Sequence, residues 1–208
     1  LEQGCHVALT DLPGENLRSL SDELSSVHGS KVLAVPLDVT DAASVTEGFG
    51  AVIRSWGGVD LVVVNAGAAH VSPLAEMDLE HFRRLERINV EGTLLVLSEA
   101  ARHFKRQNTG GDIVLISTKN VFAPGPKFGA YSATKSAAHQ LARIASLEFA
   151  ELGVRVNMVA PDAVFSSEMR KSGLWAEVGP ERMSARGLDA RGLEEYYRTR
   201  NLLKARIT

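Results

Sequence analysis

The chain has 208 residues, of which 45% are hydrophobic and 23% are charged, a composition typical of one globular domain. Its formal net charge of -2 provides no basic field of the kind that attracts nucleic acids or anionic membranes, so we expect neither partner. A single cysteine, Cys5, excludes an internal disulfide and a cysteine-based zinc site, and we interpret it as a packing residue. With no apolar run of membrane-spanning length and no signal peptide, we expect a cytoplasmic protein without a metal site.

Five apolar runs, separated by helical or turn-rich segments, follow one another along the chain. They predict strands at residues 6–12, 31–39, 59–64, 112–117 and 154–159. Pro36 lies in the second run and favours the edge of a sheet, because proline has no amide hydrogen to donate. The third run is apolar throughout, which is typical of a strand buried on both faces of a parallel sheet.

The segments between these runs carry apolar residues at helical spacing. The longest predicted helix covers residues 79–105, with Asp78 as its N-cap. The helix after the fourth strand begins near Tyr131 and ends at Gly153. Strands that alternate with helices through short connections predict an α/β protein with a doubly wound parallel sheet of the Rossmann type.

Residues 117–135 join the fourth strand to the helix that follows it. Tyr131 and Lys135 are four residues apart and therefore share one helix face. A phenol has a reference pKa of about 10, so action as a base near neutrality requires a decrease of roughly three units, or about 4 kcal/mol, and a nearby ammonium can supply much of it. Ser117 ends the strand, where its hydroxyl can polarise a carbonyl oxygen. A tyrosine and a lysine at this spacing can also be a plain surface pair.

Acidic residues end the first two predicted strands. Dinucleotide-binding sheets place such an acid against the adenosine ribose, and Asp11 has the right position. A 2′-phosphate about 4 Å away would cost on the order of 4 kcal/mol at an effective dielectric of 20, and the next three residues offer no basic side chain, so NAD is favoured over NADP. Asp38 and Val39 close the next strand, where an adenine ring would lie. Either aspartate can instead only start a turn or cap a helix.

Two further positions combine small or polar residues with a place near strand ends. Asn65, Ala66 and Gly67 follow the third strand, and their small side chains allow a cofactor to approach the backbone closely. Asn89 lies inside the long predicted helix, although asparagine is a poor helix former. It can hold a water that carries protons away from Lys135, or it can be an exposed helix residue.

Together these residues resemble the short-chain dehydrogenase/reductase family over nearly the whole chain. The resemblance implies hydride transfer between NAD and a substrate carbon, with Tyr131 exchanging the substrate's hydroxyl proton and Lys135 also holding the nicotinamide ribose. It implies a catalytic tetrad of Asn89, Ser117, Tyr131 and Lys135. The cofactor contacts it implies are Asp11, Asp38, Val39, Asn65, Ala66, Gly67, Tyr131, Lys135, Pro161 and Val164.

The chain departs from the family pattern in three places. The glycine-rich turn T-G-x-x-x-G-x-G after the family's first strand has no counterpart, the family's later P-G reads Pro161-Asp162, and the last strand has no counterpart either. We therefore expect residues 1–208 to be a single dinucleotide-binding and catalytic domain, truncated at both ends and part of a longer protein. The neighbours of the absent first strand would be left with unpaired backbone groups and an open core.

The sequences S-T-K-N-V-F-A-P-G-P-K-F-G-A-Y, N-M-V-A-P-D-A-V-F and E-E-Y-Y-R-T-R-N-L-L-K are most similar to the dehydrogenase half of bifunctional rhamnulose-1-phosphate aldolase/short-chain dehydrogenases. This resemblance implies a fused amino-terminal aldolase domain and a small polar substrate, a lactaldehyde or a sugar derivative. Residues 166–208 are polar and arginine-rich, and we expect them to cover the substrate. Phe165 and Trp175 can line the pocket or cover the core.

Three alternatives follow from the same residues. Sorbitol-6-phosphate dehydrogenases look similar in the carboxyl-terminal region, and Lys119, Asn120, Lys127 or the arginines after residue 166 would then hold a phosphate, unless they are solvated surface residues. A dinucleotide-binding regulatory module would need the cofactor site without the Tyr131–Lys135 pair. A structural partner domain would use the helices at residues 79–105 and 131–152, which in the family form homodimers or homotetramers, unless their apolar residues face the sheet.

Overall fold

The computed structural model describes residues 1–165 and 173–207. Its strands are β1 (Val7–Asp11), β2 (Val32–Pro36), β3 (Leu61–Val64), β4 (Gly111–Ile116) and β5 (Val154–Val159). Its longer helices are α1 (Glu15–His28), α2 (Ala42–Trp56), α3 (Leu79–Glu86), α4 (Gly92–Gln107), α5 (Gly129–Glu148), α6 (Gly173–Ser184) and α7 (Ala190–Arg200). Every strand pairing is parallel, so the predicted α/β fold of the Rossmann type is confirmed.

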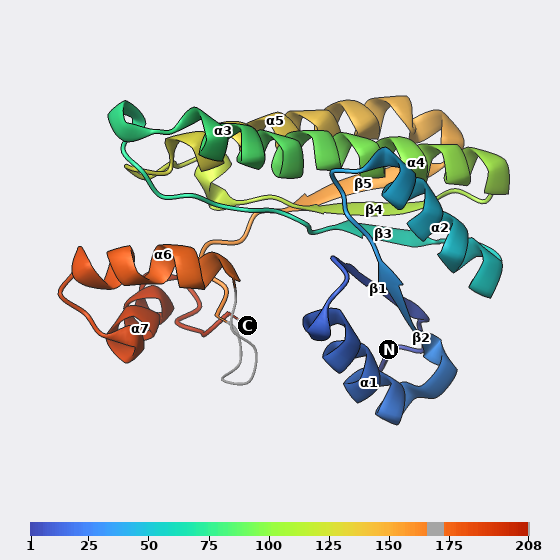
Figure 1. The fold of residues 1–208 in the computed structure, drawn as a ribbon, viewed down its shortest axis with the longest axis horizontal. Helices are drawn as coiled ribbons and strands as arrows, with labels where there is room; N and C mark the ends of the chain where they lie inside the picture. The colour runs from blue at the N-terminus through green and yellow to red at the C-terminus, as the bar shows by residue number, and fades with distance from the viewer. Residues whose placement is uncertain (166–172, 208) are drawn as a thin grey trace.

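The strands form two separate sheets, β1–β2 and β3–β4–β5, and among the described residues no ladder joins β1 to β3. Pro36 ends β2, which pairs with β1 alone in this topology, so the predicted edge position is confirmed. In Figure 1, α3, α4 and α5 cover one face of the β3–β4–β5 sheet, whereas none of the helices that the structure describes packs along its other face. The exposed fractions of Leu61 and Val63 are both 54%, so the prediction that this strand is buried on both faces is wrong.

The main core lies between the β3–β4–β5 sheet and the helices α2, α4 and α5. Ile113 and Leu115 alternate along β4 with exposed fractions of 0% and 1%, as expected for a strand that presents one face to helices. Phe104 of α4 packs over Gly111 so closely that a Cβ at that position would overlap the ring. Leu37 extends this core from the end of β2, because it packs against Gly48 of α2. Helix α2 therefore links the two sheets.

The long predicted helix contains an irregular turn in its middle. Asp78 caps α3 as predicted, because its carboxylate accepts a hydrogen bond from the amide of Glu80 at 3.1 Å. Between α3 and α4, residues Arg87–Glu91 form a π-helical turn that contains Asn89. The hydrogen bonds of such a turn span five residues instead of four, and such turns are frequent at functional sites. Helix propensity alone does not predict this conformation for Asn89.

The described part of residues 166–208 forms α6 and α7, which lie on the side of the sheet opposite α5 (Figure 1). Residues 166–172 and 208 of the predicted covering region lie outside the described residues. Phe165 stacks on Trp175 with 4.7 Å between ring centres, and both pack against Tyr197. These aromatic rings also line the cavity described below, so they take both of the roles that the sequence left open.

Two expectations about surface and solvent are tested directly. Cys5 is exposed, so its interpretation as a packing residue is wrong; it precedes β1 in a segment that packs against no buried cluster. Within the described ranges, the helices are too short or too polar to span a membrane.

Candidate active site

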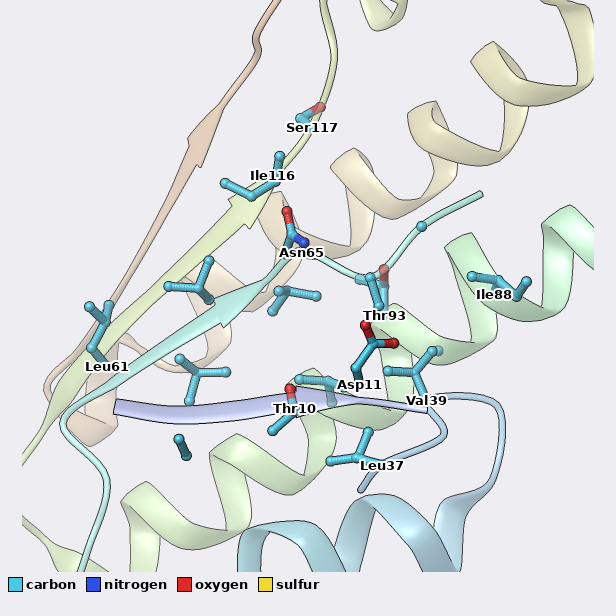
Figure 2. Close-up of a pocket in the computed structure, with 18 of the residues that line it drawn as sticks. Thr10, Asp11, Leu37, Val39, Leu61, Asn65, Ile88, Thr93, Ile116 and Ser117 are labelled. Atoms are coloured by element: carbon cyan, nitrogen blue, oxygen red, sulfur yellow. The ribbon is translucent and has the colours of Figure 1, made fainter. Parts of the chain in front are cut away.

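A cavity of about 2300 Å³ lies along the carboxyl ends of the strands and extends into the gap between β1 and β3. Figure 2 shows residues of four strand ends around it: Thr10 and Asp11 of β1, Leu37 and Val39 after β2, Asn65 after β3, and Ile116 and Ser117 at the end of β4. Tyr131 and Lys135 of α5 line it as well. The cavity therefore gathers the side chains that the sequence predicts at separate strand ends.

Tyr131 and Lys135 lie at the start of α5 with exposed fractions of 9% and 5%. The Lys135 ammonium donates a hydrogen bond at 2.7 Å to the carbonyl oxygen of Ile116, the last residue of β4. Because both side chains are buried and face one cavity, the interpretation as a plain surface pair is wrong.

Burial dominates the proton affinities of this pair. It raises the pKa of Tyr131, although a side-chain hydrogen bond with Thr118 opposes the rise, and it lowers the pKa of Lys135 to about 8. The expected lowering of the Tyr131 pKa by Lys135 is therefore not found in this structure. The physical reason is that Lys135 is hydrogen-bonded to a backbone carbonyl, while both groups lose solvation.

The carboxamide of Asn89 holds the loop that follows β3. Its Nδ2 donates to the carbonyl oxygen of Ala68 at 2.9 Å, and its Oδ1 accepts from the amide of the same residue at 2.9 Å. A third hydrogen bond, at 3.0 Å, joins Nδ2 to the hydroxyl of Thr134 on α5. With an exposed fraction of 1%, Asn89 is not the exposed helix residue of the alternative interpretation. Both hydrogens of Nδ2 are used in these bonds, so a water held by this side chain would have to donate to the second lone pair of Oδ1.

The loop of Asn65, Ala66 and Gly67 comes close to this cluster. A Cβ added to Gly67 would lie 3.2 Å from Oδ1 of Asn89 and 3.8 Å from Nζ of Lys135. The missing side chain thus leaves backbone open toward the cavity beside Lys135, as a tightly bound dinucleotide requires. This local geometry fits the cofactor that the sequence implies.

Ser117 and the next residue, Thr118, direct their hydroxyls to different partners. The Ser117 Oγ lies 3.0 Å from Nδ1 of His139, whose pKa is lowered by burial and by the positive charge of Arg143. The side chain of Thr118 hydrogen-bonds Tyr131. Consecutive residues of an extended chain point in opposite directions, so only one of these hydroxyls meets the phenol. The sequence analysis missed Thr118, and the only available signal was two adjacent hydroxyl residues at a strand end.

The acidic residues at the first two strand ends lie in the cavity wall and also form local turns. Asp11 is exposed and accepts a hydrogen bond from the amide of Leu12 at 2.7 Å. The amide and the hydroxyl of Thr40 both donate to Asp38 at 2.8 Å, and these bonds lower the pKa of Asp38. Each aspartate thus has the turn role that the sequence allowed, while its position leaves the ligand role open.

Val39 packs against the first residue of α4. A Cβ on Gly92 would lie 2.8 Å from Cγ2 of Val39, so glycine is needed at this approach. This contact places Val39 in the cavity wall between the end of β2 and α4 (Figure 2).

Asp162 is the centre of a small ion-pair cluster at the end of β5. Its carboxylate lies 3.1 Å from Nζ of Lys119 and 2.9 Å from Nη2 of Arg200 on α7. Its neighbours Pro161 and Val164 line the cavity, and the carbonyl oxygen of Val164 accepts the indole hydrogen of Trp175. Asp162, which departs from the family's P-G, therefore connects the end of β5 to α7.

Of the predicted phosphate ligands, Lys119 and Lys127 are already paired. Lys119 binds Asp162, and Lys127 lies 2.8 Å from the carboxylate of Glu181 on α6. Asn120 is buried and lines the cavity. In the described part of the chain, no group of three or more histidine, cysteine or acidic side chains is arranged to hold a metal ion.

A parallel α/β sheet with a tyrosine, a lysine and a bare glycine loop at the carboxyl ends of its strands has the architecture of the Rossmann-type α/β class. The family model described as short chain dehydrogenase matches residues 1–176, and the chain belongs to this family.

The chain is similar to several characterised and uncharacterised relatives. It is 36% identical over 206 residues to the protein called uncharacterized oxidoreductase YuxG of Bacillus subtilis (strain 168), covering 99% of this chain and 30% of that protein. It is 32% identical over 164 residues to sorbitol dehydrogenase of Cereibacter sphaeroides, covering 79% of this chain and 62% of that enzyme. The chain thus spans less than two thirds of either relative.

Solved structures of related proteins share the fold. Sorbitol-6-phosphate 2-dehydrogenase SrlD from Erwinia amylovora superposes with a TM-score of 0.86 at 27% identity, covering 100% of this chain and 79% of that one. An alcohol dehydrogenase from Thermococcus sibiricus complexed with 5-hydroxy-NADP has a TM-score of 0.72 at 30% identity, covering 79% of this chain and 68% of that one. A 3-ketoacyl-(acyl-carrier-protein) reductase from Brucella melitensis complexed with NADH has a TM-score of 0.71 at 25% identity, covering 78% and 67%.

Proposed function

We propose that the protein is an NAD-dependent oxidoreductase that acts on a small polar hydroxy or aldehyde substrate. The observation that carries this proposal is the buried pair of Tyr131 and Lys135, which faces a cavity bounded by the strand ends. The bound cofactor would accept or supply the hydride through its nicotinamide ring. The protein's own side chains would bind the substrate, position it and move the proton.

Tyr131 would exchange the proton of the substrate's hydroxyl group. A phenol has a reference pKa of about 10 and is therefore protonated at neutral pH, and burial raises the pKa of Tyr131 further, so it can donate to a carbonyl oxygen. When the substrate is oxidised, Tyr131 would instead act as a phenolate base. The protonated form of Lys135 would favour this phenolate, since an adjacent positive charge stabilises an anion. Asn89 would hold the loop at Ala68 against this pair through the hydrogen bonds already described.

A hydroxyl beside Tyr131 would polarise the reacting oxygen. The resemblance assigns this role to Ser117, whose Oγ is engaged with His139, whereas Thr118 contacts Tyr131 itself. The geometry favours Thr118, with Ser117 as the second candidate. Either donor would act on the substrate oxygen where negative charge develops.

The preference for NAD rests on Asp11. Its exposed carboxylate at the end of β1 would accept hydrogen bonds from ribose hydroxyls and repel a 2′-phosphate. Asp38 and Val39 would lie at the adenine ring, and the loop at Asn65, Ala66 and Gly67 would lie along the cofactor. Because related structures contain either NADP or NADH, the fold alone does not decide between the two.

A sugar derivative or lactaldehyde is the proposed substrate, and a phosphorylated polyol is the second candidate. The sorbitol dehydrogenase among the relatives supports the first class. The second class is supported by the similarity to sorbitol-6-phosphate 2-dehydrogenase, which covers 100% of this chain and so includes α6 and α7. We propose that these helices cover the substrate.

The proposed assembly is a cytoplasmic homodimer or homotetramer that uses α4 and α5. Exposed apolar side chains on these helices, Leu94, Ile144 and Leu147, support this arrangement. A fused aldolase domain remains part of the proposal because the chain covers only 30% of the Bacillus subtilis relative. A dinucleotide-binding module without turnover is the competing proposal, and the buried Tyr131–Lys135 pair argues against it.

The direct experiment uses the full-length protein and follows the absorbance of reduced nicotinamide. NAD and NADP are each supplied with lactaldehyde, sorbitol and sorbitol 6-phosphate, and Tyr131→Phe serves as the inactive control. Turnover that requires NAD and disappears in this variant supports the proposal. Binding of NAD without turnover of any substrate would favour the regulatory module.

A further inference from the structure

Arg182 of α6 faces the cavity next to Tyr131 and has no ion-pair partner among residues 1–165 and 173–207. Its Cζ lies 4.5 Å from the centre of the Phe128 ring. That ring packs edge-on against Tyr131, with 6.2 Å between ring centres. One aromatic ring therefore separates the guanidinium from the phenol, and all three side chains line the cavity.

The two carboxylates closest to Arg182 in sequence are bound elsewhere. Glu181 pairs with Lys127 at 2.8 Å, and Glu177 lies 2.9 Å from Nδ1 of His70. Neither acid neutralises Arg182 in this arrangement. The guanidinium thus presents its charge to the cavity.

The ion-pair cluster at the end of β5 adds to this positive field. The single carboxylate of Asp162 contacts two cations, Lys119 and Arg200, so the cluster carries one excess positive charge. Asp162 and Lys119 line the same cavity as Arg182. The cavity wall therefore attracts an anion through both Arg182 and Lys119.

The stacking on Phe128 leaves the hydrogen-bonding edge of Arg182 available. A guanidinium that lies over an aromatic face keeps its N–H donors in the plane of the group, where they can bind two oxygens of one phosphate. The loop beside it is bare at Gly125, where an added Cβ would lie 3.5 Å from Nη2 of Arg182. Asn120, buried in the same wall, offers amide hydrogens to the ligand.

We propose that Arg182 binds the phosphate group of a phosphorylated polyol or sugar whose reacting hydroxyl lies at Tyr131. This inference rests on the proposed function, which it makes specific by naming the substrate class. Arg182 is a specificity residue in this assignment, because it contacts a part of the substrate that does not react.

The test measures binding of sorbitol 6-phosphate and of sorbitol to the full-length protein by calorimetry in the presence of NAD. Arg182→Gln should weaken the binding of sorbitol 6-phosphate by about 30-fold, since a charge-assisted hydrogen-bonded pair is lost, and should leave sorbitol binding unchanged. Arg182→Lys should keep part of the affinity. The matched control is Arg186→Gln on the same segment, because that guanidinium lies 5.0 Å from the ring centre of Tyr196 and does not line the cavity.

Several outcomes would overturn the assignment. Equal affinity of the unaltered protein for sorbitol and its 6-phosphate, or equal losses for both ligands in the glutamine variant, would mean that Arg182 does not recognise phosphate. If Arg182→Gln does not fold, Arg182→Lys is measured instead, together with competition by inorganic phosphate. Arg182 would not recognise phosphate if Arg182→Lys kept the full preference for sorbitol 6-phosphate over sorbitol and inorganic phosphate did not compete with sorbitol 6-phosphate. A phosphate-specific loss without turnover of either ligand would support this inference while contradicting the proposed function.

Discussion

The hydroxyl of Ser117 and Nδ1 of His139 are 3.0 Å apart, and this contact turns the serine away from the role that its position suggests. His139 lies two turns after Tyr131 on α5, so it faces the strand end from the same helix. The neighbouring hydroxyl of Thr118 contacts Tyr131 instead. The hydroxyls of two adjacent residues therefore have different partners, His139 for Ser117 and Tyr131 for Thr118.

We therefore expect Thr118→Ala to lower kcat/KM more than Ser117→Ala. Loss of a positioned donor to a developing oxyanion costs about 100- to 1000-fold, whereas loss of a contact that only orients the loop costs much less. Steady-state kinetics of both variants with the best substrate make the comparison. Thr118→Ser is the matched control and should retain most activity, and a larger loss in Ser117→Ala would return the role to the serine.

Lys135 should make stability depend on pH in the alkaline range. Burial lowers its folded-state pKa from 10.5 to about 8, so the unfolded chain binds more protons between these values and the free energy of unfolding rises as the pH increases. The rise is at most about 3 kcal/mol at 1.36 kcal/mol per pKa unit. Urea unfolding of the full-length protein at several pH values, with Lys135→Met for comparison, measures it. The variant should lack this rise, and parallel curves for the two proteins would contradict the assignment.

Asn89→Ala should destabilise the fold as well as reduce activity. The change leaves both the amide and the carbonyl of Ala68 without their partner, at a cost of about 2 kcal/mol for two partly buried polar groups. Denaturant unfolding is the measurement, and Asn16→Ala on the exposed face of α1 is the control, expected to stay within about 0.5 kcal/mol. Equal stability of the two variants would show that water replaces the lost hydrogen bonds.

Gly111→Ala should be destabilising because its methyl group would overlap the ring of Phe104, and overpacking of a core costs about 1 to 3 kcal/mol. Gly14→Ala is the matched control, since nothing lies within 4 Å of its added Cβ and its φ of 170° is accessible to alanine. Thermal unfolding of both variants decides the point. A melting temperature for Gly111→Ala equal to that of the control would mean that Phe104 moves aside at little cost.

Asp11→Ser should change the choice of cofactor. Removal of the carboxylate removes the repulsion of a 2′-phosphate, so the ratio of kcat/KM with NADP to that with NAD should rise by about 100-fold, in keeping with a like-charge cost of a few kcal/mol. Kinetics with each dinucleotide at constant ionic strength measure the ratio. An unchanged ratio would remove Asp11 from the cofactor site.

Relationships within one turn or one strand end follow well from the sequence. The shared face of Tyr131 and Lys135, the cap at Asp78 and the edge position of Pro36 depend on local spacing, and the structure confirms them. The parallel α/β class follows equally well, because the alternation of strands and helices leaves few topologies.

Contacts between residues that are far apart in the sequence could not be predicted from local spacing. The bond between Asn89 and Ala68 needs a π-helical turn that no propensity predicts, and the split between Ser117 and Thr118 depends on the phase in which β4 ends. The exposure of Leu61 depends on which helices pack on the sheet, and the apolar run of this strand does not predict whether helices cover one face or both. Likewise, the pairing of Lys119 with Asp162 brings together residues 43 positions apart.

Asp162 has a mechanical consequence. Its carboxylate joins Lys119, one residue after Thr118, to Arg200 on α7, so two ion pairs connect this helix to the segment that carries the hydroxyl. Ion pairs with this degree of solvent contact contribute about 0 to 1 kcal/mol each. Each of the two ion pairs is therefore weak enough to break and re-form without a change in the packed core of the β3–β4–β5 sheet.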